Sequence, residues 1–500
     1  MKLSKLLDGI SDIEVVNFKD FEITSISVNS DKCHSGTLFF AMKGASHNGI
    51  DFIPRAHKLG ARAFVCGEKT AISDDSVLIY SEKPRKTLAE LCAKMSGNPE
   101  KRLMFVGITG TKGKTTTAFF VSKILDGAGI SNLLIGTLGI GSAAKKTVNT
   151  TPDPTVLFPA LKDALHRGIK VIVLEVSSQA LKDYRVYGIS FDCVVFTGLG
   201  YDHIGLSEHP TLSDYVASKR SLFNSYGAKR AVVNFDDPYS SYMSAGIPRV
   251  IKCGFSCGAD LCIEGYFDGA SGCEFTVNSH TVRCKLFGEY NARNITLAIG
   301  TAKEICGISI ENALNCVREV TVPGRFNIFK VGDVSAVVDY AHNYDSMCAA
   351  LSLARRLFYG RIICVFGSVG ERSIFRRVQI AKAAEKYADF SIITIDNPGY
   401  ESPVSICRDI YEAFLDKSRA KIVAHRARAI DYAIKLAMPG DVVMILGRGH
   451  ENSINISGVS IRFSDIEYVK ELSRIYSVKP SHIDAADKPN KVFGDAAHGS

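Results

Sequence analysis

The stretch LMFVGITGTKGKTTTAFFVSKIL, residues 103–125, decides the fold: an apolar strand enters a glycine- and threonine-rich turn and leaves it as an amphipathic helix. Strand, loop and helix in this order form a cradle for phosphate, because the backbone N–H groups at a helix start attract anions. Gly110 and Gly113 let these groups point at phosphate oxygens. Lys114 can reach the β and γ phosphates, and the Thr115 hydroxyl can bind Mg²⁺. The stretch therefore predicts a nucleotide site.

The loop departs from the generic phosphate-loop pattern, because five residues rather than four separate Gly107 from Gly113. An ordinary strand-to-helix glycine turn is the alternative interpretation. The sequence Gly-Lys-Thr-Thr at residues 113–116 opens a helix directly after a buried strand, and this context favours nucleotide binding over a plain turn.

Polar side chains also follow two further apolar strands. Glu175 ends VIVLE, and Asp202 and His203 follow VVFTGLG. Because ligands of open α/β sheets bind at the carboxyl ends of strands, Glu175 and His203 are candidate Mg²⁺ ligands. The alternative for Glu175 is a helix-capping acid. Lys219, in DYVASKRSLF, is by composition a solvated helix lysine.

Around this stretch the chain divides into three α/β parts. Residues 1–98 hold short strand-like runs and end at a Ser-Gly-Asn-Pro turn. Residues 99–325 and 326–478 each alternate apolar strands with helical patterns, which is typical of a mainly parallel sheet covered on both faces. Residues 479–500 lose this periodicity, so we predict a flexible tail there.

The composition describes a globular protein, because 46% of the 500 residues are apolar and only 22% are charged. Disorder and small disulfide scaffolds are therefore excluded. The net charge of +8 is spread without a basic run, which suits small anionic substrates, and we expect neither nucleic acid nor a membrane as partner. The 14 cysteines are scattered, and their densest group, at 253–284, lacks a Cys-x-x-Cys pair. We therefore expect reduced thiols in the cytoplasm and no zinc site.

Many ordered motifs make a resemblance specific. They are TGTKGKTTT, NTTP at 149–152, EVSSQAL, DHIG, EYNARN, PGRF, VVDYAHN, DNPGYESP and LGRGHE. With them the chain resembles the Mur ligases from Ser27 to about Leu472, and among these the enzymes that extend UDP-N-acetylmuramoyl-L-alanyl-D-glutamate. The resemblance implies an α/β fold of three domains: an N-terminal UDP-binding domain (1–98), a central ATP-binding domain with a P-loop-type, mainly parallel sheet (99–325), and a C-terminal, Rossmann-like amino-acid-binding domain (326–478).

The resemblance also assigns roles to individual residues. For ATP these are Gly110, Thr111, Lys112, Gly113, Lys114, Thr115, Thr116, Asn291, Asn294, Arg325, Asp339 and His342. For the UDP-linked substrate they are Val28, Ser30, Ala45, Ser46, His47, Asn149, Thr150, Thr151, Ser177 and Arg185. The catalytic group is Lys114, Glu175, His203 and Lys219, and the metal ligands are Thr115, Glu175, His203 and Lys219. Lys219 acts in the family as a carbamate, which turns a repelled ammonium into an oxygen ligand for Mg²⁺.

The implied reaction is carboxylate activation. ATP phosphorylates the D-glutamyl carboxylate, the amine of a diamino acid attacks the acyl phosphate, and phosphate leaves. Lys114 and two Mg²⁺ ions neutralise charge on the transferred phosphoryl group, and CO₂ is needed for the carbamate. We expect a monomer that binds UDP-N-acetylmuramoyl-L-alanyl-D-glutamate and a diamino acid.

The identity of that amino acid depends on the motif after Asp396. Family members that use meso-diaminopimelate usually read Asp-Asn-Pro-Arg, where the arginine pairs with the distal carboxylate. Here Gly399 replaces the arginine, while Arg377 matches the group that takes the α-carboxylate. The residues expected at the amino acid are Arg377, Asp396, Asn397, Gly447 and Glu451. We favour L-lysine, with meso-diaminopimelate as the alternative, because another basic residue can replace the missing arginine, and ornithine stays open.

Two other functions are weighed against this one. The ligase that adds D-alanyl-D-alanine has a similar N-terminal domain, but the DNP and GHE segments argue against it. A non-catalytic paralogue that senses nucleotide or precursor is the second, and the retention of Lys114, Glu175 and Lys219 argues against it.

Overall fold

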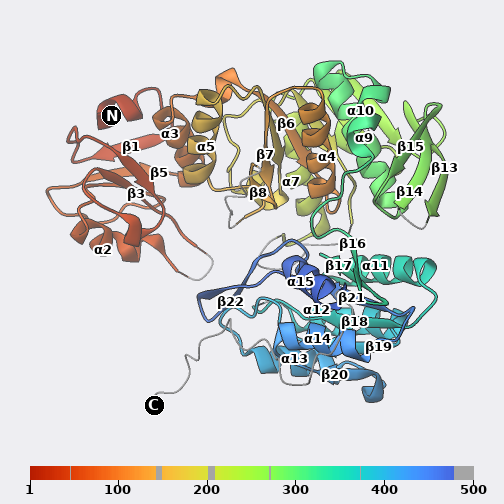
Figure 1. Cartoon of the computed structure of the whole chain (residues 1–500). Helices are drawn as coiled ribbons and strands as arrows, with labels where there is room; N and C mark the ends of the chain where they lie inside the picture. The colour runs from red at the N-terminus through yellow and green to blue at the C-terminus, as the bar shows by residue number, and fades with distance from the viewer. Residues whose placement is uncertain (45–46, 142–148, 201–208, 270–271, 372, 478–500) are drawn as a thin grey trace, which may run out of the picture. The chain divides into compact units, whose positions relative to one another are not determined.

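The computed structural model describes residues 1–44, 47–141, 149–200, 209–269, 272–371 and 373–477. The chain forms two compact units, Met1–Val320 and Thr321–Ser500 (Figure 1). The predicted tail at 479–500 lies outside the described residues. The predicted boundary at 99 falls inside the first unit, where it separates two sheets, and the predicted boundary at 326 lies close to the division between the units.

The first sheet has the order β1-β5-β4-β3-β2, and all its pairings are parallel except β1 with β5. Its strands are β1 (Ile13–Val16), β2 (Ser25–Ser27), β3 (Thr37–Ala41), β4 (Ala63–Cys66) and β5 (Val77–Ser81). Its helices are α1 (Leu3–Leu7), α2 (Ile53–Lys58) and α3 (Pro84–Met95). The strands β3 and β4 are buried along their whole length, which explains their continuous apolar runs.

The second sheet of the first unit has ten strands in the order β15-β14-β13-β12-β11-β10-β6-β9-β7-β8. They are β6 (Met104–Thr109), β7 (Asn132–Gly136), β8 (Gly139–Ile140), β9 (Val171–Glu175), β10 (Cys193–Phe196), β11 (Arg230–Asn234), β12 (Arg249–Gly254), β13 (Leu261–Gly269), β14 (Gly272–Val277) and β15 (His280–Cys284). Strands β7 and β9–β13 run parallel with β6, whereas β8 pairs antiparallel with β7, β14 with β13, and β15 with β14.

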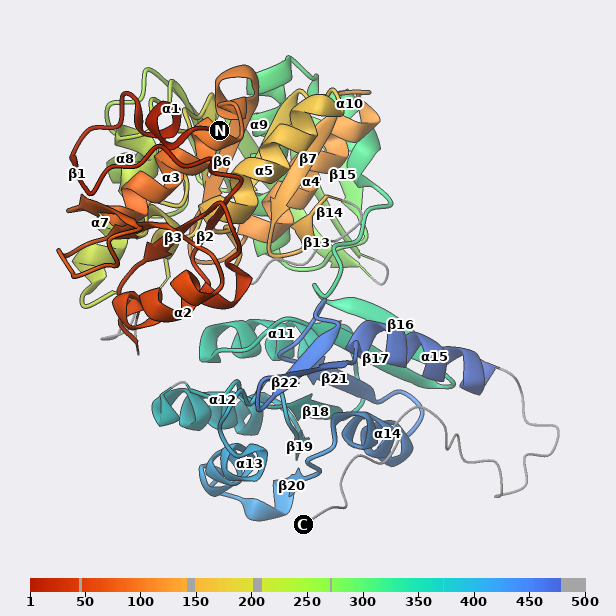
Figure 2. The same cartoon turned by 90° about the vertical axis from the view of Figure 1, so that its left-hand side faces the viewer.

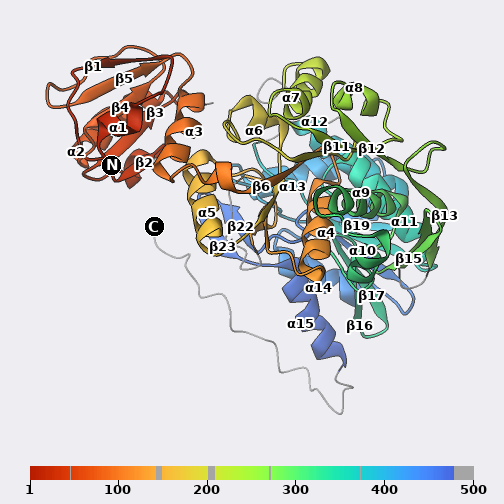
Figure 3. The ribbon, with the colours of Figure 1, turned by 90° about the horizontal axis from the view of Figure 1, so that it is seen from above.

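Helices cover both faces of this sheet. They are α4 (Lys114–Gly127), α5 (Pro154–His166), α6 (Ser178–Lys182), α7 (Leu212–Asn224), α8 (Ser240–Ser244), α9 (Glu289–Cys306) and α10 (Ile310–Val317). Helices α4 and α9 lie side by side on one face, and α5 and α7 pack on the other (Figure 3). Because α5 also packs against α3, one apolar core joins both sheets into a single unit.

The second unit holds a sheet of order β16-β17-β21-β18-β19-β20, which is parallel except for β16. Its strands are β16 (Asn327–Val331), β17 (Val334–Asp339), β18 (Ile362–Phe366), β19 (Phe390–Ile393), β20 (Ala420–Ile422) and β21 (Val442–Leu446), and β22 (Ser453–Ile456) and β23 (Val459–Arg462) form a hairpin. Helices α11 (Tyr344–Leu357), α12 (Ile374–Tyr387) and α13 (Pro403–Glu412) cover one face, and α14 (Arg426–Leu436) and α15 (Asp465–Ser477) cover the other (Figure 2).

The predicted α/β class is thus confirmed, and the apolar runs at Val171–Glu175, Cys193–Phe196, Ile362–Phe366 and Val442–Leu446 are fully buried strands. Within the described ranges, no helix is long and apolar enough to cross a membrane.

Candidate active site

The phosphate loop connects β6 to α4 and needs glycine at two positions. Gly110 has φ +151° and Gly113, which caps α4, has φ +88°. A Cβ atom at Gly110 would lie 2.0 Å from Thr197 Oγ1, and one at Gly113 would lie 2.4 Å from Asn294 Oδ1. Neighbouring side chains therefore press directly on the loop, so only glycine fits at these two points.

Lys114 is the first residue of α4 and folds back over the loop. Its Nζ donates hydrogen bonds to the main-chain oxygens of Gly110 at 2.8 Å and Thr111 at 3.2 Å. The Thr111 hydroxyl lies 2.9 Å from the Tyr215 hydroxyl of α7, and Thr197 Oγ1 donates to the main-chain oxygen of Lys112. These contacts hold a cation and a row of helix-start amides at one point, which is the arrangement that binds phosphate.

Glu175 ends β9, the strand paired with β6, and its side chain is fully buried. Its Oε2 accepts hydrogen bonds from the hydroxyls of Thr115 at 2.8 Å and Thr137 at 3.1 Å, and its Oε1 accepts one from the Thr137 backbone N–H at 2.9 Å. Burial raises the pKa of Glu175, although the Lys114 ammonium and these bonds lower it. A nearly dry carboxylate beside the phosphate loop favours a cation as its partner. The alternative of a helix-capping acid does not hold, because Ser177 caps α6.

Lys219 lies on α7 and is only 1% exposed, so it is not a solvated helix lysine. Its Nζ donates to the main-chain oxygen of Gly110 at 3.0 Å and lies 4.4 Å from the centroid of the Tyr215 ring. The fold thus brings Lys219 to the same loop residue as Lys114. Asp202 and His203 lie outside the described residues.

The residues expected at the UDP-linked substrate fall into two groups. Thr151 Oγ1 donates to the main-chain oxygen of Glu175 at 2.8 Å, the Ser177 N–H donates to Thr151 Oγ1 at 3.0 Å, and Arg185 Nη1 donates to the Thr151 main-chain oxygen at 3.2 Å. Thr150 contacts Thr137, and Asn149 is exposed. This group therefore lies beside Glu175. Val28 and His47 lie in loops of the first sheet, Ser30 begins a short 3-10 helix (Ser30–Lys32), and Ala45 and Ser46 lie outside the described residues.

A chain of hydrogen bonds links α6 to α7. His209 is buried, its Nε2 lies 3.0 Å from Ser178 Oγ, and its Nδ1 lies 2.7 Å from Asp214 Oδ2. Lys182 also contacts Asp214 at 3.2 Å. His209 therefore connects the helix that follows Ser177 with the helix that carries Lys219.

Two of the residues assigned to ATP, Asn291 and Asn294, lie on α9 next to the loop. Asn294 Oδ1 accepts from Thr117 Oγ1 at 3.4 Å, and Asn294 Nδ2 lies 3.5 Å from Asn291 Oδ1. Asn291 in turn donates to the main-chain oxygen of Phe287 at 2.8 Å. Both amides are buried, so α9 fixes the start of α4 through polar contacts.

In the second unit, Asp339 ends β17 and accepts backbone hydrogen bonds from Phe326 and Ala341, both at 2.7 Å. Burial raises the pKa of Asp339, although the nearby Arg325 guanidinium lowers it in part. That guanidinium lies 4.6 Å from the centroid of the Tyr340 ring, whose backbone oxygen lies 2.7 Å from His342 Nδ1. The structure therefore places Arg325, Asp339 and His342 around one strand end.

The Arg377 guanidinium is paired with two carboxylates of the same unit. Its side chain is 2% exposed, Nη2 contacts Glu401 at 2.6 Å and Nη1 contacts Asp409 at 2.7 Å. The pKa of Arg377 is raised by its hydrogen bond to Glu401, and that of Glu401 is lowered by the same bond. Its assignment to a substrate carboxylate stays a prediction, one that requires release from these two acids.

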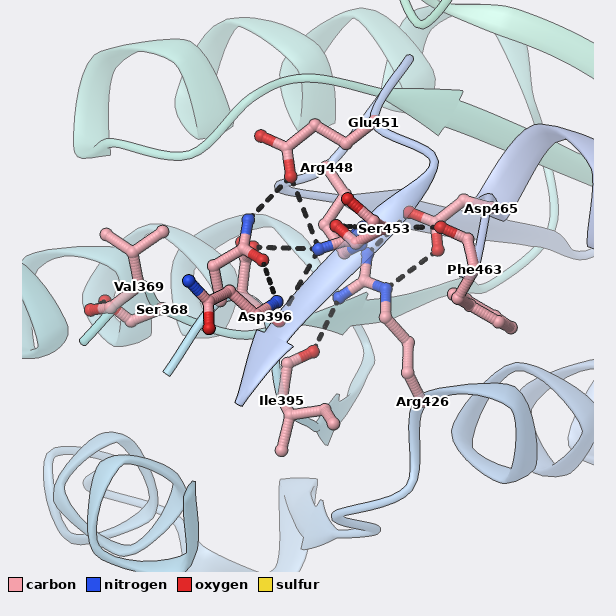
Figure 4. A network of polar contacts seen from close by, with 12 residues as sticks. Ser368, Val369, Ile395, Asp396, Arg426, Arg448, Glu451, Ser453, Phe463 and Asp465 are labelled. Carbon is pink, nitrogen blue, oxygen red and sulfur yellow. Dashed lines mark hydrogen bonds and ion pairs between the residues drawn. The ribbon is translucent and has the colours of Figure 1, made fainter. Parts of the chain in front are cut away.

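The other residues expected at the amino acid follow β19 and β21, and Figure 4 shows Asp396 and Glu451 among them. Asn397 Nδ2 donates to Glu451 Oε2 at 2.6 Å. A Cβ atom at Gly447 would lie 2.7 Å from Asp396 Oδ2. Burial raises the pKa of Asp396 and of Glu451. The predicted residues Asp396, Asn397, Gly447 and Glu451 thus form one cluster.

Sequence reasoning missed several residues that complete these sites. Thr137, Thr197, Tyr215 and His209 contact the loop, Glu175 or the helices beside them, and Arg426, Arg448 and Asp465 belong to the cluster of Figure 4. Thr197 directly follows an apolar strand, and Arg448 directly precedes the GHE segment. Their positions at a strand end and beside a motif could have identified these two residues from the sequence.

A phosphate loop on a mainly parallel sheet, with a buried carboxylate on the neighbouring strand, defines a nucleotide-using α/β enzyme. Three family profiles match the chain: "Mur ligase family, catalytic domain" at 22–96, "Mur ligase middle domain" at 108–302, and "Mur ligase, glutamate ligase domain" at 324–449. The chain belongs to the Mur ligase family. It is an ATP-dependent ligase that forms a peptide bond, as predicted.

Two relatives show how much of the chain this sequence similarity covers. A UDP-N-acetylmuramoyl-L-alanyl-D-glutamate–2,6-diaminopimelate ligase of Aquifex aeolicus is 39% identical over 90% of this chain and 93% of its own. The enzyme of the same name from Geobacillus kaustophilus is 36% identical over 93% and 98%. These names support the diaminopimelate alternative better than the L-lysine that the sequence analysis favoured.

Solved structures agree on the fold. A structure of a 2,6-diaminopimelate ligase of the same name has a TM-score of 0.64 and 26% identity, and the match covers 95% of this chain and 99% of that one. The MurF ligase of Thermotoga maritima in complex with ADP has a TM-score of 0.60 at 21% identity, and the match covers 92% and 99%. The three-domain Mur ligase architecture is therefore confirmed.

Proposed function

We propose that the chain joins a diamino acid, with meso-diaminopimelate favoured, to the D-glutamyl carboxylate of UDP-N-acetylmuramoyl-L-alanyl-D-glutamate, in cytoplasmic synthesis of the peptidoglycan precursor. The observation that carries the proposal is the convergence of Lys114, Glu175 and Lys219 on one phosphate loop, in a chain whose relatives have this activity by name. ATP phosphorylates the carboxylate, the amine attacks the acyl phosphate, and phosphate leaves.

The chain's own groups support the first step by charge and position. Lys114 and the loop amides bind the phosphates of ATP, and Thr151, Ser177 and Arg185 orient the UDP-linked substrate next to them. Such preorganised donors stabilise charge that develops on the transferred phosphoryl group without reorganising during the reaction. Lys114 serves this step as an electrostatic partner, since proton transfer is not needed there.

The family implies Mg²⁺, and the residues present fit it in part. Thr115 Oγ1 and the Glu175 carboxylate are adjacent oxygen ligands of the type that Mg²⁺ prefers, and burial of Glu175 favours a cation there. Lys219 fits only as a carbamate, because its ammonium would repel the ion. Mg²⁺, when bound, supplies charge neutralisation for phosphoryl transfer. We propose Thr115, Glu175, His203 and carbamylated Lys219 as its protein ligands.

L-Lysine is the second candidate for the amino acid, because the surroundings of Gly399 are acidic. A Cβ atom at Gly399 would lie 3.3 Å from Glu371 Oε1. A distal carboxylate placed here would face a carboxylate where the family's usual motif supplies an arginine, and that is costly without another cation.

The test is ADP release with ATP, the UDP-muramoyl dipeptide and a panel of amino acids. We expect release only when all three substrates are present, and a kcat/KM at least tenfold higher for meso-diaminopimelate than for L-lysine or ornithine. ADP release that ignores the dipeptide would refute ligase activity. A tenfold preference for L-lysine, about 1.4 kcal/mol, would instead establish the second candidate.

A further inference from the structure

The carboxylate of Asp396 is buried without a hydrogen-bond donor. The residue follows β19 and is 3% exposed, and its nearest cationic contact is Arg448 Nη1, 3.6 Å from Oδ1. Among the residues that the structure describes, none donates a hydrogen bond to this carboxylate. Arg376 is the other cation nearby, but its Nε and Nη2 donate to the main-chain oxygen of His342 at 3.2 and 3.0 Å. A buried carboxylate in this state can accept a hydrogen bond from a bound ligand.

Glu451 stands at the open side of the same cluster (Figure 4), because its side chain is 27% exposed while those of Asp396 and Arg448 are buried. Its Oε2 accepts a hydrogen bond from Asn397 Nδ2 at 2.6 Å and lies 3.3 Å from Arg448 Nη1. The other carboxylate oxygen of Glu451, Oε1, can still accept hydrogen bonds. Two carboxylates therefore flank one guanidinium group, and one of them reaches solvent.

Arg448 is fixed in place by the main chain. Its Nη2 donates to the main-chain oxygens of Ser453 at 2.9 Å and Phe463 at 3.4 Å, and its Nη1 contacts Asp396 and Glu451. Because these acceptors come from the hairpin and from the ends of two strands, the guanidinium sets the separation of the two carboxylates.

A second buried pair anchors the strand ends themselves. Arg426 binds Asp465 through two hydrogen bonds of 2.8 and 2.7 Å, and both side chains are buried. The same guanidinium donates to the main-chain oxygens of Ile395 at 3.1 Å and Leu446 at 2.9 Å. These residues immediately precede Asp396 and Gly447, so the pair holds both sides of the cluster.

The cluster combines three carboxylates, Asp396, Glu451 and Asp465, with two guanidinium groups, Arg426 and Arg448, and Arg376 is a third cation near Asp396. We propose that Arg448 is a positioning residue that holds Asp396 and Glu451 for the side-chain ammonium of the diamino acid, which donates hydrogen bonds to the open carboxylate oxygens. The inference rests on the proposed function, since it concerns the amino acid of that reaction.

The test compares Arg448→Met and Arg448→Lys in the ADP-release assay, with L-lysine, meso-diaminopimelate and L-norleucine as acceptors. L-Norleucine is L-lysine without the side-chain ammonium. For Arg448→Met we expect the KM for the better diamino acid to rise at least 30-fold, with less than a threefold change for ATP, the dipeptide substrate and L-norleucine. Arg448→Lys restores one charge at this point. We therefore expect its KM for the diamino acid to be at least tenfold lower than that of Arg448→Met.

Arg361→Met is the matched control, because it breaks another guanidinium–carboxylate pair of the same unit, with Asp441 at 2.7 Å. It should leave every KM unchanged. If Arg448→Met does not fold, Arg448→Lys decides: its KM must rise for diamino acids and stay constant for L-norleucine. Equal rises for all substrates, or an unchanged diamino-acid KM, would overturn the inference. A wild-type enzyme without ADP release would instead refute the proposed function.

Discussion

Gly113→Ala is the sharpest test of the phosphate loop, because the chain supplies its own control. Gly113 has φ +88° and Gly97 has φ +85°, so alanine meets the same left-handed backbone at both positions. That strain costs roughly 1–2 kcal/mol, partly offset by about 0.4–1 kcal/mol from the restricted unfolded chain. The two sites differ in space: nothing lies within 4 Å of a Cβ atom at Gly97, whereas Asn294 Oδ1 lies 2.4 Å from one at Gly113.

The expected difference follows from that contact. Asn294 must move by about 1 Å to restore an ordinary contact distance, which breaks its bond with Thr117 and costs on the order of 1 kcal/mol beyond the control. A shift of about 1 Å in the phosphate-binding amides costs about 100-fold in the chemical step. We therefore expect Gly113→Ala to bind ATP at least tenfold more weakly by titration calorimetry and to lose ADP release. Gly97→Ala should lose only a few degrees of thermal midpoint. Equal ATP affinity in both variants would refute the assignment of this loop.

Three further predictions address the surrounding groups. Glu175→Gln should stabilise the ligand-free protein more at pH 8 than at pH 5. Burial raises the folded-state pKa of Glu175, so ionising this carboxyl group costs stability as the pH rises through that pKa. Thermal unfolding at both pH values checks this, and the variant should lose ADP release. His209→Ala should lower the thermal midpoint and raise the KM for the UDP-linked substrate about tenfold, because the helix start at Ser177 loses its connection to α7; an unchanged KM would contradict this role. Lys219→Ala should abolish ADP release, with partial recovery on adding formate or acetate, and recovery by chloride alone would count against the carbamate.

The sequence predicted those parts of the fold and site that depend on local patterns. The phosphate loop, the strand-end position of Glu175 and the alternation of buried strands with helices were all visible, because each is set by neighbouring residues in the chain. The burial of Lys219 was not, since helix periodicity alone does not show what a helix packs against. The pairing of Arg377 with Asp409 was hidden for a similar reason, because the two residues lie on different helices and meet only in the folded unit.

Each unit buries a carboxylate whose pKa is raised by burial in spite of a nearby cation, Glu175 near Lys114 in the first and Asp396 near Arg448 in the second. Burial raises the pKa of each, so the ligand-free protein is destabilised by whatever fraction of each group is ionised at neutral pH. A bound cation removes that cost, which makes its binding energy appear as added stability. Glu175 and Asp396 therefore cannot give the highest stability to both the ligand-free and the ligand-bound protein. Replacing either carboxylate by its amide should raise the stability of the empty enzyme and remove the stabilisation that its ligand provides. A sequence under selection only for a stable core would not keep these acids.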